Sequence, residues 1–263
     1  MRKYWFIFKT TVMESIQYIL NTIIGFFTYF IVTFVFFQLW VYIYSDGQNT
    51  IAGYGLKQMV WYVMLTELMW FVNSNHTLLS QMSNDIRSGG IAYGINKPYH
   101  YLLYCVAKHF GDIAVRFVIY LVLGVLLGIL FVGPLDNFCL WQLPFVSITF
   151  ILGMTLNALI RMLINILCFW MEDAKPIQWI YDKFIIVIGT TFPIEIFPRW
   201  AQGALRFSPI FVITYGPVKL IIDFSFPLLF QVLAAQLAYL VSVALIMYFL
   251  YQKGVKRLNV NGG

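Results

Sequence analysis

The chain has 263 residues, of which 61% are hydrophobic, 19% are aromatic and only 11% are charged, and its formal net charge is +6 at pH 7. Soluble domains carry about 25% charged residues because their surfaces face water. The composition therefore excludes a soluble globular domain and predicts an all-α membrane protein. The positive charge does not indicate nucleic-acid binding, because the basic residues sort between loops in the pattern of a membrane protein.

Six long apolar runs follow one another along the chain. A helix that crosses a bilayer needs about 20 mostly apolar residues. The runs predict transmembrane helices at about 20–44, 58–78, 103–132, 142–170, 180–197 and 226–251. They are too long and too continuously apolar for the strands of a membrane barrel. We therefore expect residues 1–263 to form a single transmembrane domain.

Lysine and arginine are distributed unequally between two sets of loops. One set holds twelve of them: Arg2, Lys3, Lys9, Arg87, Lys97, Lys108, Arg116, Lys175, Lys183, Lys253, Lys256 and Arg257. The opposite set holds four: Lys57, Arg199, Arg206 and Lys219. Because loops rich in Lys and Arg stay on the cytoplasmic side, we expect a multi-pass protein with both termini in the cytoplasm.

Residues 1–19, which precede the first predicted span, are amphipathic. Polar side chains recur at helical spacing, and they are Lys3, Thr10, Glu14, Gln17 and Asn21. A helix with one polar face predicts an interfacial helix that lies on the inner leaflet. A plain helical extension of the first span is the alternative interpretation.

The longest interruption on the cytoplasmic side is the segment 83–100. Gly89, Gly90 and Gly94 favour tight turns, and Pro98 breaks any helix. A segment with this much turn structure between two spans suits a short helix that docks a cytoplasmic partner. An idle loop is the alternative.

Motifs for catalysis or nucleotide binding are missing from the sequence. It has no GxxxxGK[ST] phosphate loop, no GxSxG and no HExxH, and its three histidines do not cluster. We therefore expect no enzymatic activity and no metal site in this chain, and any energy from ATP has to come from another chain.

Four prolines interrupt the predicted external segment 192–217, which is otherwise largely apolar. They are Pro193, Pro198, Pro209 and Pro217. Proline prevents one continuous helix here. The pattern predicts short re-entrant helices before the last span, in contact with protein rather than lipid.

Arg161 lies inside the fourth predicted span, where a charged residue costs about 2.5–3.5 kcal/mol on insertion scales. Asn157 and Asn165 lie one helical turn on either side, so the three residues form one polar stripe. Two interpretations stay open. The stripe lines a substrate path, or Arg161 belongs to an internal ion pair or snorkels, and so fixes helix packing.

Glu67 lies in the middle of the second predicted span, with Trp61 and Trp70 nearby in the sequence. A carboxylate with aromatic neighbours suits a cationic substrate. We therefore expect Glu67 to face a transport path. The approximate depths of the two residues also allow Glu67 to meet Arg161.

Three short patterns occur in a fixed order along the chain. They are Asp85-Ile86-Arg87-Ser88-Gly89-Gly90 followed by Asn96-Lys97-Pro98; Phe192-Pro193 with Phe197-Pro198-Arg199-Trp200, then Ser208-Pro209 and Tyr215-Gly216-Pro217; and Gly254-Val255-Lys256-Arg257 before Asn261-Gly262-Gly263. With the six spans, they resemble the permease subunits of ABC-2-type (type V) transporters. The most similar subgroup is the "ABC-2 family transporter protein" group, which includes multidrug and viologen exporters.

The resemblance implies a permease of the bacterial cytoplasmic membrane that works as a dimer of identical or different permease chains. A separate ATPase, which binds ATP and Mg²⁺, would bind each half from below and drive a hydrophobic or cationic small molecule outward. The segment 84–98 would be the coupling helix, with Asp85, Ile86, Arg87, Gly89, Asn96, Lys97 and Pro98 at the ATPase, where Asp85 and Arg87 would form charge pairs. The external helices would include Pro193, Glu195, Pro198, Arg199 and Trp200.

Other functions remain open from the residues alone. A lipid or polysaccharide exporter of the same superfamily would have similar spans, although the apolar spans disfavour a polysaccharide. A membrane sensor or assembly protein would need no coupling element. A self-sufficient ion channel would need polar residues in several spans, and the sequence shows only one such stripe.

Overall fold

The computed structural model describes residues 2–47, 50–73 and 77–261, and these residues form helices joined by short loops. Four stretches are long and apolar enough to cross a membrane. They are α2 (Ile19–Ser45), α6 (Tyr101–Val132), Leu140–Phe169 around α7 (Leu143–Ile166), and Phe226–Arg257 within α11 (Phe226–Asn261). They match the first, third, fourth and sixth predicted spans.

The long helices carry large apolar side chains on their outer surfaces. Leu20 and Leu130 are 71% and 77% exposed, and Phe230 is 67% exposed. A water-soluble protein rarely exposes apolar side chains in such numbers. These surfaces suit lipid, and the multi-pass membrane assignment follows from them.

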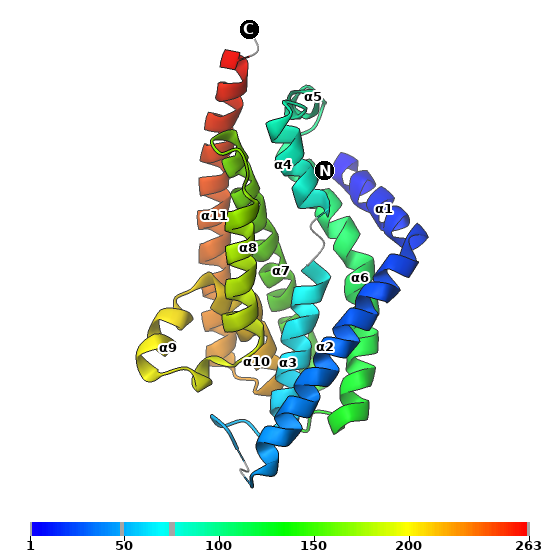
Figure 1. Cartoon of the computed structure of the whole chain (residues 1–263), viewed down its shortest axis with the longest axis vertical. Coiled ribbons are helices and arrows are strands. Elements are labelled where there is room, and N and C mark those ends of the chain that lie inside the picture. The colour runs from blue at the N-terminus through cyan, green and yellow to red at the C-terminus, as the bar shows by residue number, and fades with distance from the viewer. Residues whose placement is uncertain (1, 48–49, 74–76, 262–263) are drawn as a thin grey trace.

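Helix α3 (Leu56–Asn73) lies in the middle of the bundle, and most of its side chains are buried (Figure 1). It packs against α2 and α6 on one side and against later segments on the other. The second predicted span, 58–78, overlaps α3 for most of its length, but residues 74–76 near its end lie outside the described residues, and α4 (Thr77–Arg87) is described after them. The Asn73 amide donates to the Met69 carbonyl oxygen, one turn earlier in α3, at 2.9 Å.

The fifth predicted span, 180–197, is displaced. Helix α8 (Lys175–Phe184) continues directly into the π-helix η3 (Ile185–Thr190), and η4 (Ile194–Ile196) is a separate single turn. Pro193 separates the two because it cannot continue a helix. The π-helix also leaves carbonyl groups in reach of α3, so the Thr66 hydroxyl donates to the Thr190 carbonyl oxygen at 2.9 Å.

The N-terminal segment is a helix of its own, α1 (Arg2–Gln17), which meets α2 at a sharp corner (Figure 1). It folds back against α6, where Gly111 makes room. A Cβ atom at Gly111 would lie 2.7 Å from the Thr11 Cβ atom and 2.8 Å from the Phe8 carbonyl oxygen. The interpretation as an extension of the first span is therefore wrong, while the position of α1 on a leaflet stays a prediction.

Gly124 and Gly128 of α6 accommodate aromatic side chains from neighbouring helices. A Cβ atom at Gly128 would lie 2.6 Å from the Trp61 ring, and one at Gly124 would lie 3.0 Å from the Tyr29 hydroxyl. The Trp61 indole also donates to the Gly133 carbonyl oxygen at 3.0 Å. These glycines serve helix packing because they leave room for aromatic rings, and not because they bring two helix backbones into contact.

A buried glutamine joins three segments on the other side of the bundle. The Gln236 amide of α11 donates to the carbonyl oxygens of Thr149 in α7 and Val212 in the π-helix η5 (Phe211–Tyr215), both at 2.8 Å. Buried polar groups need such partners. Gln236 therefore fixes the last long helix to the segment before it.

The two ends of the bundle differ. Helix α5 (Ile91–Ile95), the start of α1 and the end of α11 lie towards one end, and α9 (Arg199–Arg206) lies towards the other (Figure 1). Helix α9 and the segment Phe211–Ile222, which contains η5 and α10 (Gly216–Ile222), form a pair bent by 77°. This pair is the fifth span candidate by length and composition, as a broken span or a re-entrant loop.

Candidate functional site

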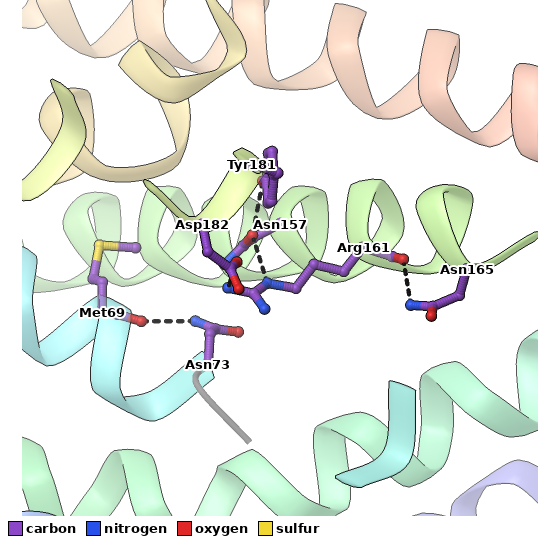
Figure 2. A network of polar contacts seen from close by, with 7 residues as sticks. All are labelled: Met69, Asn73, Asn157, Arg161, Asn165, Tyr181 and Asp182. Atoms are coloured by element: carbon purple, nitrogen blue, oxygen red, sulfur yellow. Dashed lines mark hydrogen bonds and ion pairs between the residues drawn. The ribbon is translucent and has the colours of Figure 1, made fainter. Parts of the chain in front are cut away.

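Arg161 of α7 is fully buried and lies at the centre of a polar network (Figure 2). One terminal nitrogen, Nη2, is 2.8 Å from Oδ1 of Asp182 in α8. Its Nε donates to Oδ1 of Asn157 at 3.3 Å. The guanidinium carbon lies 5.4 Å from the ring centre of Trp70 and 5.8 Å from that of Tyr181. The cation is thus held by a carboxylate, an amide and two aromatic faces.

The network extends along α7 in both directions. The Tyr181 hydroxyl donates to Asn157 Oδ1 at 2.8 Å, and the Asn165 amide donates to the Arg161 carbonyl oxygen at 2.8 Å. The Ser83 hydroxyl of α4 donates to Asn165 Oδ1 at 2.9 Å. A buried cation is tolerated when its partners are this complete. The network joins α7 to α3, α4 and α8, so its geometry is that of a structural crosslink.

Glu67 does not take part in this network. Its side chain is 4% exposed and interacts with the Thr190 hydroxyl, and no ion pair joins it to Arg161. The two residues therefore do not meet, because Asp182 occupies the position beside the guanidinium. Nor do the two tryptophans gather around Glu67, since Trp61 packs on α6 and Trp70 on Arg161.

The expected coupling segment forms the end of α4, a turn and the short helix α5. Asp85 is half-buried and its Oδ2 accepts a hydrogen bond from the Tyr101 hydroxyl at 2.9 Å. Ile86 is buried, whereas Arg87 is exposed. Gly89 has a φ angle of 75°, which glycine adopts without strain and other residues rarely do. The turn therefore requires glycine at this position.

The far side of this segment is open to solvent. Tyr93 is 81% exposed, and the Lys97 ammonium lies 5.9 Å from the ring centres of both Tyr93 and Tyr99. The Asn96 backbone N–H donates to the Ala92 carbonyl oxygen and closes the helix. The Pro98 carbonyl oxygen accepts a hydrogen bond from the Lys3 ammonium, and this bond ties the segment to α1. The exposed cation Lys97 thus lies beside α5, and the segment that follows α5 is fixed to α1.

The Pro-rich segment is built around Glu195. The hydroxyls of Tyr54, at 3.2 Å, and of Tyr215 donate to its two carboxylate oxygens. The Lys219 ammonium lies 4.4 Å from the Tyr54 ring centre. A cavity of about 270 Å³ borders Glu195, Lys219 and Arg206. The loop after α2 is therefore joined to the segment before α11.

Two prolines of this segment mark the starts of short helices. Pro193 directly precedes η4, and Pro198 directly precedes α9, which begins at Arg199. Trp200 of α9 is 83% exposed. Pro217 does not break a helix, because it lies at the start of α10, which follows η5 without interruption. That these short helices are re-entrant and external stays a prediction.

Sequence reasoning missed Asp182 and Ser83. Asp182 stands beside Lys183, which the charge count places in a cytoplasmic loop, although both residues lie inside α8. A signal was present, because a lone Arg within a span needs a counter-charge and Asp182 is the acidic residue at the start of the next apolar run. The C-terminal pair Gly262-Gly263 of the third motif lies outside the described residues.

The long apolar helices, the buried central helix and the buried charge network together define a polytopic helical membrane protein. The family model described as "ABC-2 family transporter protein" matches residues 27–262. The chain belongs to this family and is a transmembrane permease of an ABC transporter. Membership implies association with ABC ATPase subunits and with a membrane. A comparison with curated proteins found no significant match.

Proposed function

We propose that the chain is the permease of an ATP-driven exporter that moves a hydrophobic or cationic small molecule outward. Family membership supports the permease role, and Glu67 carries the proposal for the substrate. Its carboxylate is buried in the central helix, and no Lys or Arg forms an ion pair with it in the described chain. An intramembrane carboxylate without a counter-charge is costly and typically marks a substrate or ion path.

The proposed complex has two permease chains, identical or different, and separate ATPase subunits that bind ATP and Mg²⁺. In each permease, α3 and the continuous α8–η3 segment complete six crossings with the four long helices. The excess of Lys and Arg in one set of loops supports cytoplasmic termini in the cytoplasmic membrane of a bacterium. Helix α5 then serves as the coupling helix, and α9 and α10 form the external helices. The permease contributes no catalytic residue.

Replacement of Glu67 by Gln tests the substrate proposal. We expect ATP-driven uptake of methyl viologen, ethidium and tetraphenylphosphonium into inside-out vesicles to fall about tenfold, which corresponds to about 1.4 kcal/mol. The variant Glu67→Asp should retain most of the transport. The variant Glu172→Gln, which removes an exposed carboxylate, is the matched control and should transport normally.

Co-purification with the ATPase separates the two parts of the proposal. Glu67→Gln should leave the complex intact, because Glu67 lies inside the bundle. Unchanged transport of every tested cation by an intact Glu67→Gln complex would refute the role of Glu67 as a cation site.

A further inference from the structure

A cavity lies between the α1–α2 corner and helices α4 and α6. Its volume is about 520 Å³, and its charged lining residues are Glu14, Lys108, Asp112 and Arg116. A second cavity of about 270 Å³ shares Glu14 and Lys108 with it. The two residues therefore stand where two hollows meet.

The charged residues that α6 contributes to this cavity form a stripe. Lys108, Asp112 and Arg116 are spaced four residues apart, so they share one helix face. Arg116 is engaged, because its Nη2 lies 3.4 Å from Asp112 Oδ2 and its Nη1 donates to the Val72 carbonyl oxygen at 3.3 Å. Lys108 donates to the Gln81 side-chain oxygen at 3.2 Å, and no carboxylate in the described chain lies within ion-pair distance of it.

Glu14 faces the same cavity from α1, and it too has no ion-pair partner among the residues described. A carboxylate and an ammonium group thus border one cavity without pairing with each other. Each attracts a ligand group of opposite sign. Because the four charged lining residues sum to zero, a ligand with both charges fits better than an anion or a cation alone.

A phosphate joined to a primary amine has this chemistry. The phosphate would accept hydrogen bonds from the Lys108 ammonium, with Arg116 adding positive charge nearby. The primary ammonium would donate to the Glu14 carboxylate. A soluble amino-alcohol phosphate and the headgroup of a membrane phospholipid both carry these groups.

The surroundings of the cavity favour the lipid. Asn21 and Thr22 of α2 line it, and the adjacent side chains Leu20 and Ile23 are apolar and 71% and 49% exposed. Helix α2 has 27 residues. At 1.5 Å per residue it is about 40 Å long, which exceeds the hydrocarbon core of about 30 Å. Its first turn therefore reaches the level of the headgroups.

We propose that this cavity binds the headgroup of a zwitterionic phospholipid with a primary amine, of the phosphatidylethanolamine class, with its acyl chains along the start of α2. Such a lipid would bridge α1 and α6 at the corner of the fold. The proposal does not depend on which substrate the transporter carries.

Lipid titration of the delipidated full-length chain, purified in mild detergent with the subunits that accompany it, tests the proposal. The probes are palmitoyl-oleoyl phosphatidylethanolamine, the matching phosphatidylcholine and the matching phosphatidylglycerol, followed by native mass spectrometry and by thermal unfolding. We expect the ethanolamine lipid to bind most tightly and to raise the melting temperature, since a ligand that binds only the folded state stabilises it.

The variant Glu14→Gln/Lys108→Gln should bind the ethanolamine lipid at least tenfold more weakly. Its melting temperature without lipid should match the parent, because both side chains lie at the rim of the fold and lack ion pairs there. Lys108→Arg should keep the binding. Glu172→Gln/Lys175→Gln, which removes the same two charges from exposed positions just before and at the start of α8, is the matched control.

Three results would overturn the proposal. The first is equal binding of the ethanolamine lipid by the parent and by the Glu14→Gln/Lys108→Gln variant. The second is binding of phosphatidylglycerol as tight as that of the ethanolamine lipid, which would indicate a purely anionic ligand. The third is competition by soluble phosphoethanolamine at the concentration of the lipid, which would assign the cavity to a soluble ligand.

Discussion

The substitution Asp182→Asn is expected to lower the free energy of unfolding by about 3–5 kcal/mol, the usual cost of breaking a buried ion pair. Arg161 would remain fully buried but would lose the carboxylate that lies 2.8 Å from its Nη2 atom. The asparagine keeps the shape of the side chain, so the loss reports charge rather than volume. Thermal unfolding in detergent, followed by tryptophan fluorescence, measures it.

An exposed ion pair provides the matched control. Lys57 and Asp136 are 2.6 Å apart, and the Asp136 side chain is 77% exposed. Water screens such pairs, so Asp136→Asn should cost less than about 1 kcal/mol. Equal melting temperatures for the parent and Asp182→Asn would contradict the account of the buried network.

The double variant Arg161→Leu/Asp182→Leu separates the two interpretations of Arg161. Replacing both charges by apolar residues is often neutral or stabilising, so stability should return to within about 1 kcal/mol of the parent. Normal transport by this variant would establish that the network serves packing. A stable variant that no longer transports would instead assign Arg161 to the substrate path.

The charge reversal Arg87→Glu/Lys97→Glu is expected to weaken binding of the ATPase at least tenfold and to abolish the ATP turnover that the permease stimulates. Both cations are exposed beside α5, at the end of the bundle where α11 ends (Figure 1). Asp85 is less suited to an external contact, because its carboxylate already accepts the Tyr101 hydroxyl. Co-purification and ATPase assays of the complex measure both effects.

Two exposed arginines in α9 give the control for this reversal. Arg199→Glu/Arg206→Glu introduces the same change of charge at the opposite end of the bundle. It should leave ATPase binding unchanged. If the α5 variant bound and stimulated the ATPase as the parent does, α5 would not be the coupling helix.

Sequence alone predicts the bounds of a helix well where a continuous apolar run fills that helix. The expected spans 20–44 and 103–132 differ by only a residue or two from α2 and α6. Lipid contact imposes this simple pattern along a whole helix. Helix α3 is different because other helices surround it, so its sequence tolerates polar residues.

The candidate site was less predictable, because it depends on which helix faces which. The stripe of Asn157, Arg161 and Asn165 follows from helical spacing, and the structure brings these residues together as expected. The lone Arg161 indicates that a counter-charge is needed, but the packing of α8 against α7 decides that Asp182 supplies it. The π-helices around Gly189 and Val212 also leave no periodic signal, although they shape the contacts with α3 and α11.

Affinity purification of the tagged chain from its native membrane in mild detergent, followed by mass spectrometry, tests the central claim most directly. An ABC ATPase should be recovered in an amount comparable to the chain, with a second permease chain if the dimer is mixed. Recovery of the folded chain alone, without any ATPase, would contradict its role as the permease of an ABC transporter.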